Sequence, residues 1–429
     1  MKKLAVNSCR LLLAAVFIVS GFVKAVDPAG TQYKIGDYLE AMGMGGLLPD
    51  MALTAASIAQ LAVEFCIGIF LLFAIQRRLT SRLALAVMLV MTPLTRWIAL
   101  ANPVSDCGCF GDALVLTNWQ TFWKNVVLLA CAITVAIWPT EMFRFVSRSN
   151  QWIVINYSAL FILAVSAWSL YDLPLFDFRP YHIGANIRQG MEIPDGAPKA
   201  EYETTFIMEK DGKRQEFTLD NYPDSTWTFV DSKTVQTREG YVPPIHDFSM
   251  LLLAADTDED AEENDITDQV LSDTSYVMLL VSPHLEQADD SRHDLINELF
   301  EYCQEHAYAF YCLTASTPKS IRQWQDMTGA EYPFCQTDEI TLKTVIRSNP
   351  GLVLLKDGTV IGKWSHNNLP QIAADQAATT LDKLEIGQMD DDAAATKILR
   401  LLLLFVLPLA LLTLADRLWM WTKWLRRSK

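Results

Sequence analysis

Six stretches of about twenty mostly apolar residues stand out along the chain. A helix of that length crosses the roughly 30 Å hydrocarbon layer of a bilayer. The pattern therefore predicts six membrane-spanning helices, five in the first 170 residues and one near the C-terminus. We expect the first run to be retained, because no small-x-small cleavage site precedes Asp27-Pro28. The predicted spans cover about 6–26, 51–75, 79–101, 119–138, 152–170 and 397–421.

Lysine and arginine are unevenly distributed among the segments that would join these spans. Cytoplasmic loops of membrane proteins carry an excess of basic residues. If the six helices alternate in direction, every basic cluster falls on one side, whereas the loop 102–118 contains no lysine or arginine. We therefore expect both termini in the cytoplasm and this loop outside. The clusters are Lys2 and Lys3; Arg77, Arg78 and Arg82; Arg144 and Arg148; and Lys423, Arg426, Arg427 and Lys429.

Charge divides the chain in the same way. Residues 171–396 carry a net charge of −25 and the remainder +10, which together give the −15 of the whole chain. An acidic surface of this size argues against nucleic acid as a partner. We expect this region outside the bilayer, in the periplasm of a bacterial inner membrane, where thiols tend to be oxidised.

Within the acidic region the pattern changes twice. Alternating residues around Asp211-Gly212, followed by a further pair of short strands, predict a small β-rich element over 196–240. The acidic run 256–268 is predicted to be a solvated loop, because a calcium loop would need glycine where Ala261 stands. From 275 to 365 strands alternate with helices and end in a hairpin, which predicts an α/β domain with a mixed sheet.

Residues 243–364, from PPIHDFSM to SNPGLVLLKDGTVIGKW, resemble a thioredoxin-fold domain of the peroxiredoxin-like kind. The resemblance places Asn349-Pro350 where that family has a cis-proline ahead of its hairpin, so Pro350 is the cis-proline candidate. It also implies a cysteine after the first central strand, at a helix N-terminus that lowers the thiol pKa. The sequence at that place, SPHLEQAD (282–289), has none. We expect this domain to bind a client without performing dithiol chemistry itself.

Three other cysteines lie in the same region. Cys303 and Cys312 fall on a predicted helix and strand, where free cysteine packs as a small hydrophobe. A Cys312–Cys335 disulfide stays open, because the sequence does not establish the Cα separation that such a bond needs. The histidines show no ligand spacing, so no metal site is expected.

The segment DCGCFGD, residues 106–112, lies in the loop expected outside the membrane. Gly108 lets the chain turn sharply, so the sulfurs of Cys107 and Cys109 can approach each other. Three interpretations are open: a redox pair, a structural turn with inert thiols, and a metal clip that would lack further ligands. A disulfide in so small a ring would be strained, and strained, exposed disulfides are the oxidising, labile ones. This argument favours the redox pair.

Three ionisable residues are predicted near the same end of the bundle. Lys24 ends the first span, Glu64 lies near the middle of the second, and Arg96 lies inside the outer end of the third. Such residues are costly in a membrane and are usually paired or functional. In one interpretation Lys24 and Arg96 reach the surface, while Glu64 bonds a neighbouring helix. In the other, Arg96 pairs with Glu64, and Arg96 or Lys24 lowers the pKa of a thiol in the CGC loop. A small pocket beside these residues would then admit a quinone-like electron acceptor.

Residues 1–140 resemble the MauE branch of the DoxX family of membrane proteins, most specifically in the string CGCFGD. That family is associated with the maturation of a disulfide-rich periplasmic enzyme. The resemblance therefore implies a role in thiol–disulfide chemistry, with the lipid bilayer and a periplasmic client protein as partners.

The sequence thus predicts a membrane α-helical bundle joined to an external α/β thioredoxin-like domain. The leading hypothesis is an inner-membrane accessory protein for periplasmic thiol–disulfide exchange or protein maturation, acting as a thiol–disulfide oxidoreductase through its CxC pair. The alternative is a non-enzymatic scaffold or assembly factor of an envelope complex. The expected parts are a bundle at 1–170, a linker and β-rich element at 171–240, a thioredoxin-like periplasmic domain at 241–396, and a C-terminal helix with a basic tail at 397–429.

Overall fold

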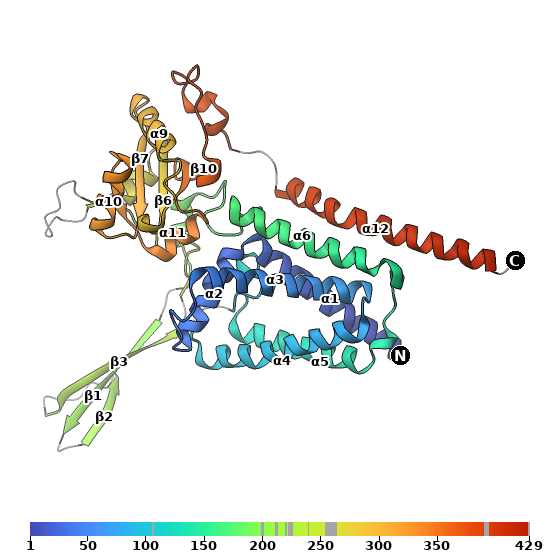
Figure 1. The fold of residues 1–429 in the computed structure, drawn as a ribbon. Coiled ribbons are helices and arrows are strands. Elements are labelled where there is room, and N and C mark those ends of the chain that lie inside the picture. Colours follow the sequence, from blue (N-terminus) through green and yellow to red (C-terminus); the bar gives the residue numbers. More distant parts are fainter. Residues whose placement is uncertain are drawn as a thin grey trace.

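The computed structural model describes residues 1–104, 107–198, 201–210, 213–218, 221, 226–238, 240–253, 264–389 and 394–427. Six of its helices have the length and apolar composition to cross a membrane, which confirms the six predicted spans. These helices are α1 (Lys2–Val26), α3 (Asp50–Phe73), α4 (Arg77–Ala101), α5 (Asn118–Ile137), α6 (Gln151–Tyr171) and α12 (Ala394–Arg427). Figure 1 shows the α/β domain at one end of the bundle, called the domain end below, and the N-terminus at the other.

Glycines let α1 and α3 pack closely. A Cβ atom added at Gly21 would lie 2.5 Å from the backbone nitrogen of Phe65, and one at Gly68 would lie 2.7 Å from that of Ile18. Membrane helices use small residues in this way because their association depends on close packing. The contact brings the last turns of α1 beside the middle of α3.

The C-terminal helix α12 lies beside α6 (Figure 1). The ring of its Phe405 packs against those of Phe65 and Phe161, with centroids 5.4 and 4.4 Å apart. Near the other end of α12, the Asp416 carboxylate accepts hydrogen bonds of 2.7 Å from the Ser147 and Asn150 side chains. Many of the remaining leucines of α12 are exposed, as expected of a helix face in contact with lipid.

The helix α2 (Pro28–Ala41), which was not predicted, follows α1 directly at the domain end. Asp27 caps it by accepting a hydrogen bond of 2.9 Å from the Gly30 backbone, and Pro28 occupies its first position. Apart from Pro28, none of its residues is fully buried. The segment therefore lacks the apolar stripe by which amphipathic helices are recognised.

The α/β domain is built on a seven-stranded sheet of order β10-β9-β6-β7-β8-β4-β5. The strands are β4 (Leu251–Leu252), β5 (Asn264–Asp265), β6 (Tyr276–Ser282), β7 (Ala309–Thr314), β8 (Phe334–Gln336), β9 (Gly351–Lys356) and β10 (Thr359–Ser365). The helices are α7 (Ile187–Met191), α8 (Thr267–Leu271), α9 (His293–Glu305), α10 (Pro318–Thr328) and α11 (Glu339–Val345).

This strand order is that of the thioredoxin fold, as the sequence predicted. The unit β6-α9-β7 joins two parallel strands, and β9 then pairs antiparallel with both β6 and β10. The Asn349–Pro350 peptide bond ahead of β9 is cis. Every residue of β6 is buried, because an apolar cluster covers each face of the sheet.

The three cysteines of the domain are buried free thiols. Cys312 belongs to the apolar cluster on one face of the sheet, together with Cys303, whereas Cys335 belongs to the cluster on the other. Cys335 pairs with Leu313 across the strands, and neighbouring strand residues point to opposite faces. The disulfide between Cys312 and Cys335 that the sequence left open is therefore not formed.

A separate antiparallel sheet of order β2-β1-β3 projects from the domain end (Figure 1). Its strands are β1 (Glu201–Lys210), β2 (Lys213–Thr218) and β3 (Thr228–Arg238). The prediction of two short strands after residue 225 is wrong, because β3 pairs along the whole length of β1 as one strand. The predicted turn at Asp211-Gly212 and residues 256–263 of the acidic run lie outside the described residues.

The glycine contact between α1 and α3 leads to a stability prediction. Gly21→Ala should destabilise the protein by about 1–3 kcal/mol, because the added methyl group pushes the two backbones apart. Gly36→Ala in α2 is the matched control, since nothing lies within 4 Å of a Cβ there. Thermal unfolding in detergent, followed by circular dichroism, compares the two variants. Equal melting temperatures for both would contradict the tight contact.

Candidate functional site

The CGC loop, residues 107–112, lies at the domain end between α4 and α5. Asn102 ends α4 with a φ of 46°, and Gly108 turns the chain between the two cysteines with a φ of 61°. The Sγ atoms of Cys107 and Cys109 consequently lie 3.1 Å apart as free thiols. A disulfide bond needs them only about 1 Å closer.

Side chains from α1 and α2 fix the backbone of this loop. The Tyr38 hydroxyl donates a hydrogen bond of 2.5 Å to the carbonyl oxygen of Cys107. The Ser20 hydroxyl lies 2.7 Å from the carbonyl oxygen of Cys109 and 2.8 Å from the Glu64 carboxylate. These contacts hold the backbone of the loop at both cysteines.

Lys24 and Glu64 form a buried ion pair next to the loop. The Lys24 Nζ lies 2.8 Å from both carboxylate oxygens of Glu64, and the two residues are 4% and 7% exposed. Gln60 donates a further hydrogen bond of 3.2 Å to the same carboxylate. The prediction that Glu64 pairs with Arg96 is wrong. Arg96 is exposed, because the adjacent Thr95 occupies the face of α4 that packs on α5.

The other interpretation, in which Lys24 and Arg96 both reach the surface, is wrong for Lys24. Arg96 is exposed, but Lys24 is buried. Lys24 ends on the side of α1 that faces α3, so its amine meets Glu64 rather than solvent. The buried carboxylate therefore has a charged partner, as a desolvated ion requires.

The two thiols of the CGC loop have different electrostatic environments. A hydrogen bond from the Cys107 thiol lowers the pKa of Cys109 to about 6, although burial opposes the charged form. The amines of Lys124 on α5 and of Lys24 lower the same pKa further. The hydrogen bond and burial raise the pKa of Cys107. Cys109 is therefore the more acidic thiol of the pair.

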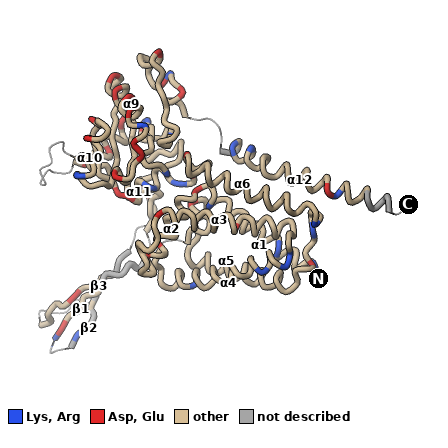
Figure 2. The backbone as a smooth tube through the Cα atoms, in the orientation of Figure 1, with Lys and Arg blue, Asp and Glu red and all other residues tan. Residues whose placement is uncertain are grey.

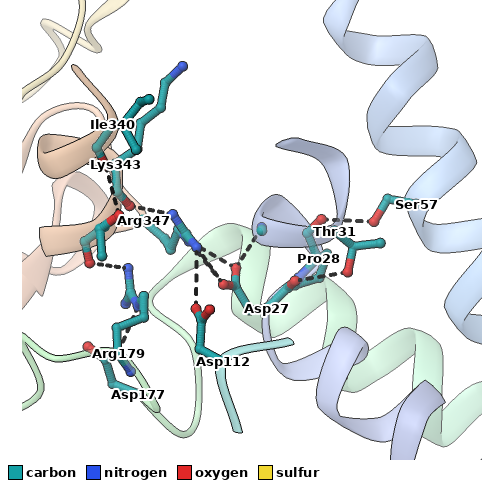
Figure 3. A network of polar contacts seen from close by, with 12 residues as sticks. Asp27, Pro28, Thr31, Ser57, Asp112, Asp177, Arg179, Ile340, Lys343 and Arg347 are labelled. Carbon is teal, nitrogen blue, oxygen red and sulfur yellow. Dashed lines mark hydrogen bonds and ion pairs between the residues drawn. The ribbon is translucent and has the colours of Figure 1, made fainter. Parts of the chain in front are cut away.

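Arg347, between α11 and the cis-proline, attaches the α/β domain to this region (Figure 3). Its guanidinium donates to both carboxylate oxygens of Asp27 at 2.8 to 3.1 Å and lies 4.0 Å from the Asp112 carboxylate. It also lies over the Tyr33 ring, 5.2 Å from the centroid. Burial would raise the pKa of Asp27, but the charge and hydrogen bonds of Arg347 hold it below its ordinary value. The contact joins the domain to the bundle.

A second ionic cluster attaches the segment after α6 to the domain (Figure 3). The Asp177 carboxylate accepts hydrogen bonds of 2.7 Å from both Arg179 and Lys363. Arg179 also donates to the carbonyl oxygen of Thr344 in α11, at 3.0 Å. Burial lowers the pKa of Lys363 to about 8, although Asp177 favours its charged form. The domain is therefore held by two separate ionic contacts.

A cleft of about 1120 Å³ lies between the CGC loop and the domain. Gly108 and Asp112 line it from the loop, and Pro283, His284 and Asn349 line it from the domain. Pro283 and His284 follow β6, where the thioredoxin-like family carries its cysteine, and Asn349 precedes the cis-proline. The domain surface that performs dithiol chemistry in that family thus faces the loop that carries the cysteine pair.

Cys109 also lines a much smaller cavity inside the bundle. This cavity measures about 40 Å³, and its polar lining includes Lys24, Glu64, Lys124 and Asn125. It has room for about three water molecules, at roughly 10–15 Å³ each. Cys109 therefore borders a small cavity with both polar and apolar lining, while Gly108 of the same loop borders the cleft.

The structure brings five predicted site residues together, namely Lys24, Glu64, Cys107, Gly108 and Cys109. The residues that sequence reasoning missed are Ser20, Asp27, Tyr38, Asp112, Lys124 and Arg347. Asp112 ends the string CGCFGD, which did not indicate its contact with Arg347, and the other five belong to no recognised functional motif. Only the helix-start signal Asp27-Pro28 could have placed α2, and with it Tyr38, near the loop. Among the described residues, no three His, Cys, Asp or Glu side chains are grouped to hold a metal ion.

Comparison with known proteins gives a family match for the membrane part. Residues 2–138 match the family described as methylamine utilisation protein MauE. Residues 202–239, which include most of the projecting sheet, match a domain of unknown function (DUF8463). No curated protein matches the chain. The chain therefore combines MauE-like membrane helices with a thioredoxin-like domain.

One solved structure from Bacteroides thetaiotaomicron, provisionally assigned as a protein disulfide isomerase, is similar to part of the chain. It is 16% identical with a TM-score of 0.22, and the match covers 29% of this chain and 77% of that one. So distant a likeness adds nothing to the fold that the strand order itself shows.

The thiolate at Cys109 can be tested by its pH dependence. Alkylation of Cys109 in the reduced protein should be fast at neutral pH and slow down as the pH falls through about 6, because the thiolate is the reacting form. Cys107→Ala removes the hydrogen-bond donor and should move this midpoint upward, towards the ordinary value of about 8.5. Mass spectrometry of iodoacetamide-treated protein measures both profiles. A wild-type midpoint at the ordinary value would contradict the assignment.

Proposed function

We propose that this chain is a membrane-bound thiol–disulfide exchange protein of the bacterial envelope. Cys107 and Cys109 alternate between dithiol and disulfide. The observation that carries the proposal is their position, with sulfurs 3.1 Å apart, beside a cleft whose other wall is the active-site surface of a thioredoxin fold. The MauE match over residues 2–138 supports it, since that resemblance implies maturation of a disulfide-containing protein.

In the proposed reaction the pair oxidises a client. A client thiolate attacks one sulfur of the Cys107–Cys109 disulfide, a mixed disulfide forms, and the other cysteine leaves as a thiolate. A second client thiolate then attacks the mixed disulfide. The client gains a disulfide bond, and the pair gains two electrons. The low pKa of Cys109 makes it the better leaving group and stabilises the reduced pair, which favours oxidation of the client.

The thioredoxin-like domain binds the client in this proposal. Its cleft-facing position carries His284 instead of cysteine, and His284 is engaged with the Glu339 carboxylate at 3.0 Å. The domain offers the shape of a thioredoxin surface, with the cis-proline beside the cleft, but no sulfur there. The membrane loop provides the sulfur chemistry.

A membrane oxidant must restore the disulfide after each turnover. A quinone-like acceptor remains our hypothesis for this step, because it would take up the two electrons and two protons of the dithiol. The cavity beside Cys109 is in the right place, but its 40 Å³ is far below the roughly 300–1,000 Å³ of small-molecule sites. The surrounding helices would therefore have to open before a quinone ring could reach the sulfur.

The proposal places the α/β domain in the periplasm and both termini in the cytoplasm. Figure 2 shows lysine and arginine positions gathered at the end of the bundle opposite the domain. Basic residues of this kind mark the cytoplasmic side of bacterial membrane proteins. The CGC loop would then face the compartment in which disulfides form.

Disulfide transfer should depend on both cysteines of the loop. The oxidised protein in nanodiscs, mixed with a reduced dithiol peptide, should oxidise the peptide and gain two maleimide-reactive thiols. Cys107→Ser and Cys109→Ser should each abolish transfer, because neither variant can form the intramolecular bond. Cys66→Ser, which changes a cysteine within α3, is the matched control and should transfer normally.

The same measurement separates the proposal from its alternative. If the pair stays in one oxidation state under every redox poise, the exchange mechanism is wrong. The protein would then be a non-enzymatic scaffold, with the thioredoxin-like domain as its binding module.

Membrane orientation can be tested with single cysteines in a variant that lacks the native ones. Leu114→Cys replaces an exposed residue just after the CGC loop, and Glu301→Cys replaces an exposed residue of α9. Both should react with an impermeant maleimide in intact spheroplasts. Ser149→Cys, at an exposed position between α5 and α6, should react only after permeabilisation. Labelling of Ser149→Cys in intact spheroplasts would refute the proposed orientation.

A further inference from the structure

The end of the bundle opposite the α/β domain carries a group of arginines that the redox proposal does not use. Arg10 lies on α1, Arg77 starts α4, and Arg144 and Arg148 lie between α5 and α6. The charge of Arg77 is within electrostatic range of the other three. Figure 2 shows basic residues gathered at this end of the molecule. Four cations at one place repel each other unless an anion lies among them.

The described hydrogen bonds donated by Arg10 and Arg77 go to backbone carbonyl oxygens. Arg10, which is 2% exposed, donates a hydrogen bond of 2.5 Å to the carbonyl oxygen of Phe143. Arg77 donates one of 2.9 Å to the carbonyl oxygen of Thr140. None of the ion pairs formed by described residues involves Arg10, Arg77, Arg144 or Arg148. Neither the buried Arg10 nor the three more accessible arginines have a carboxylate partner within the described part of the chain.

Three of the arginines also keep a buried donor without an acceptor. The Nε atoms of Arg10, Arg77 and Arg144 are buried and make no hydrogen bond to any described residue. Among the described residues, six buried side-chain nitrogen or oxygen atoms have no hydrogen-bond partner, and three of these six belong to this cluster. A buried donor on a charged group is costly when unpaired, and native proteins rarely leave one so. The unpaired atoms indicate a missing acceptor.

We infer that this arginine cluster, Arg10, Arg77, Arg144 and Arg148, binds a phosphate-type oxyanion. Guanidinium groups recognise phosphate through paired, charge-assisted hydrogen bonds, and Nε belongs to the set of donors that they use. The cluster lies at the ends of membrane-spanning helices, where phospholipid headgroups lie. The phosphate of an anionic phospholipid and free inorganic phosphate offer the same oxygens. Either one would tie α1, α4 and the loop after α5 together.

The test uses the full chain, purified in detergent and stripped of lipid. Phosphatidylglycerol and inorganic phosphate are titrated separately, with native mass spectrometry recording bound lipid and thermal unfolding recording stabilisation. The double variant Arg77→Gln, Arg144→Gln should weaken binding by about tenfold or more, because it removes charge-assisted hydrogen bonds. Arg78→Gln is the matched control, since it removes an exposed charge from the next position of α4. It should change the affinity less than about twofold.

Each outcome decides the matter. Arginine-dependent binding of phosphatidylglycerol without an effect of inorganic phosphate identifies a lipid headgroup, and saturable stabilisation by inorganic phosphate identifies a free oxyanion. The inference is wrong if neither ligand binds the wild type, or if Arg78→Gln weakens binding as much as the double variant does. Arg77→Lys with Arg144→Lys keeps the charges but not the planar donors. Its affinity should lie between wild type and the glutamine variant, which separates recognition from loss of folding.

Discussion

A single ion pair buried among apolar helices determines how the candidate site is held. Removing water from two charges costs several kcal/mol per ion, which is recovered only with close geometry and further hydrogen bonds. Lys24 and Glu64 meet this requirement with two contacts of 2.8 Å and with additional hydrogen bonds to the carboxylate. The glycine contact between α1 and α3 brings the two side chains this close. Because Ser20 contacts both Glu64 and the Cys109 carbonyl oxygen, the pair also fixes the CGC loop.

The end of α1 connects this pair to the α/β domain. Lys24 points into the bundle, and Asp27, three residues later, pairs with Arg347 of the domain. Since the pKa of Asp27 is lowered in the folded protein, its pairing stabilises the fold above the ordinary value of 3.8 and is lost as the pH falls through the folded value. Arg347 also approaches Asp112 in the CGC loop. Arg347 therefore contacts both the end of α1 and the CGC loop, which fixes the domain relative to the cysteine pair.

Features with a strong local signal could be predicted from the sequence, whereas the partners of individual side chains could not. Apolar runs marked the spans, and alternating strands and helices marked the thioredoxin order. The sequence suggested Arg96 or an unspecified neighbouring helix as the partner of Glu64, whereas the partner in the structure is Lys24. Whether Arg96 could reach Glu64 depends on which face of α4 packs against the other helices. The sequence does not indicate that face, because the lipid-facing positions of α4 are apolar as well. Arg347 lies 320 residues from Asp27, and no local pattern relates the two.

The reactive cysteine pair lies in a loop of the membrane bundle and not in the thioredoxin-like domain, so the bundle must lower the pKa of the thiol. In thioredoxin-fold enzymes a helix N-terminus lowers the pKa of the reactive thiol. In this chain the hydrogen bond from Cys107 and the amines of Lys124 and Lys24 have that effect on Cys109. Both lysines come from the membrane bundle, so the acidity of the thiol does not depend on the α/β domain. The domain itself has no cysteine at the cleft, and its three cysteines are buried in its apolar clusters.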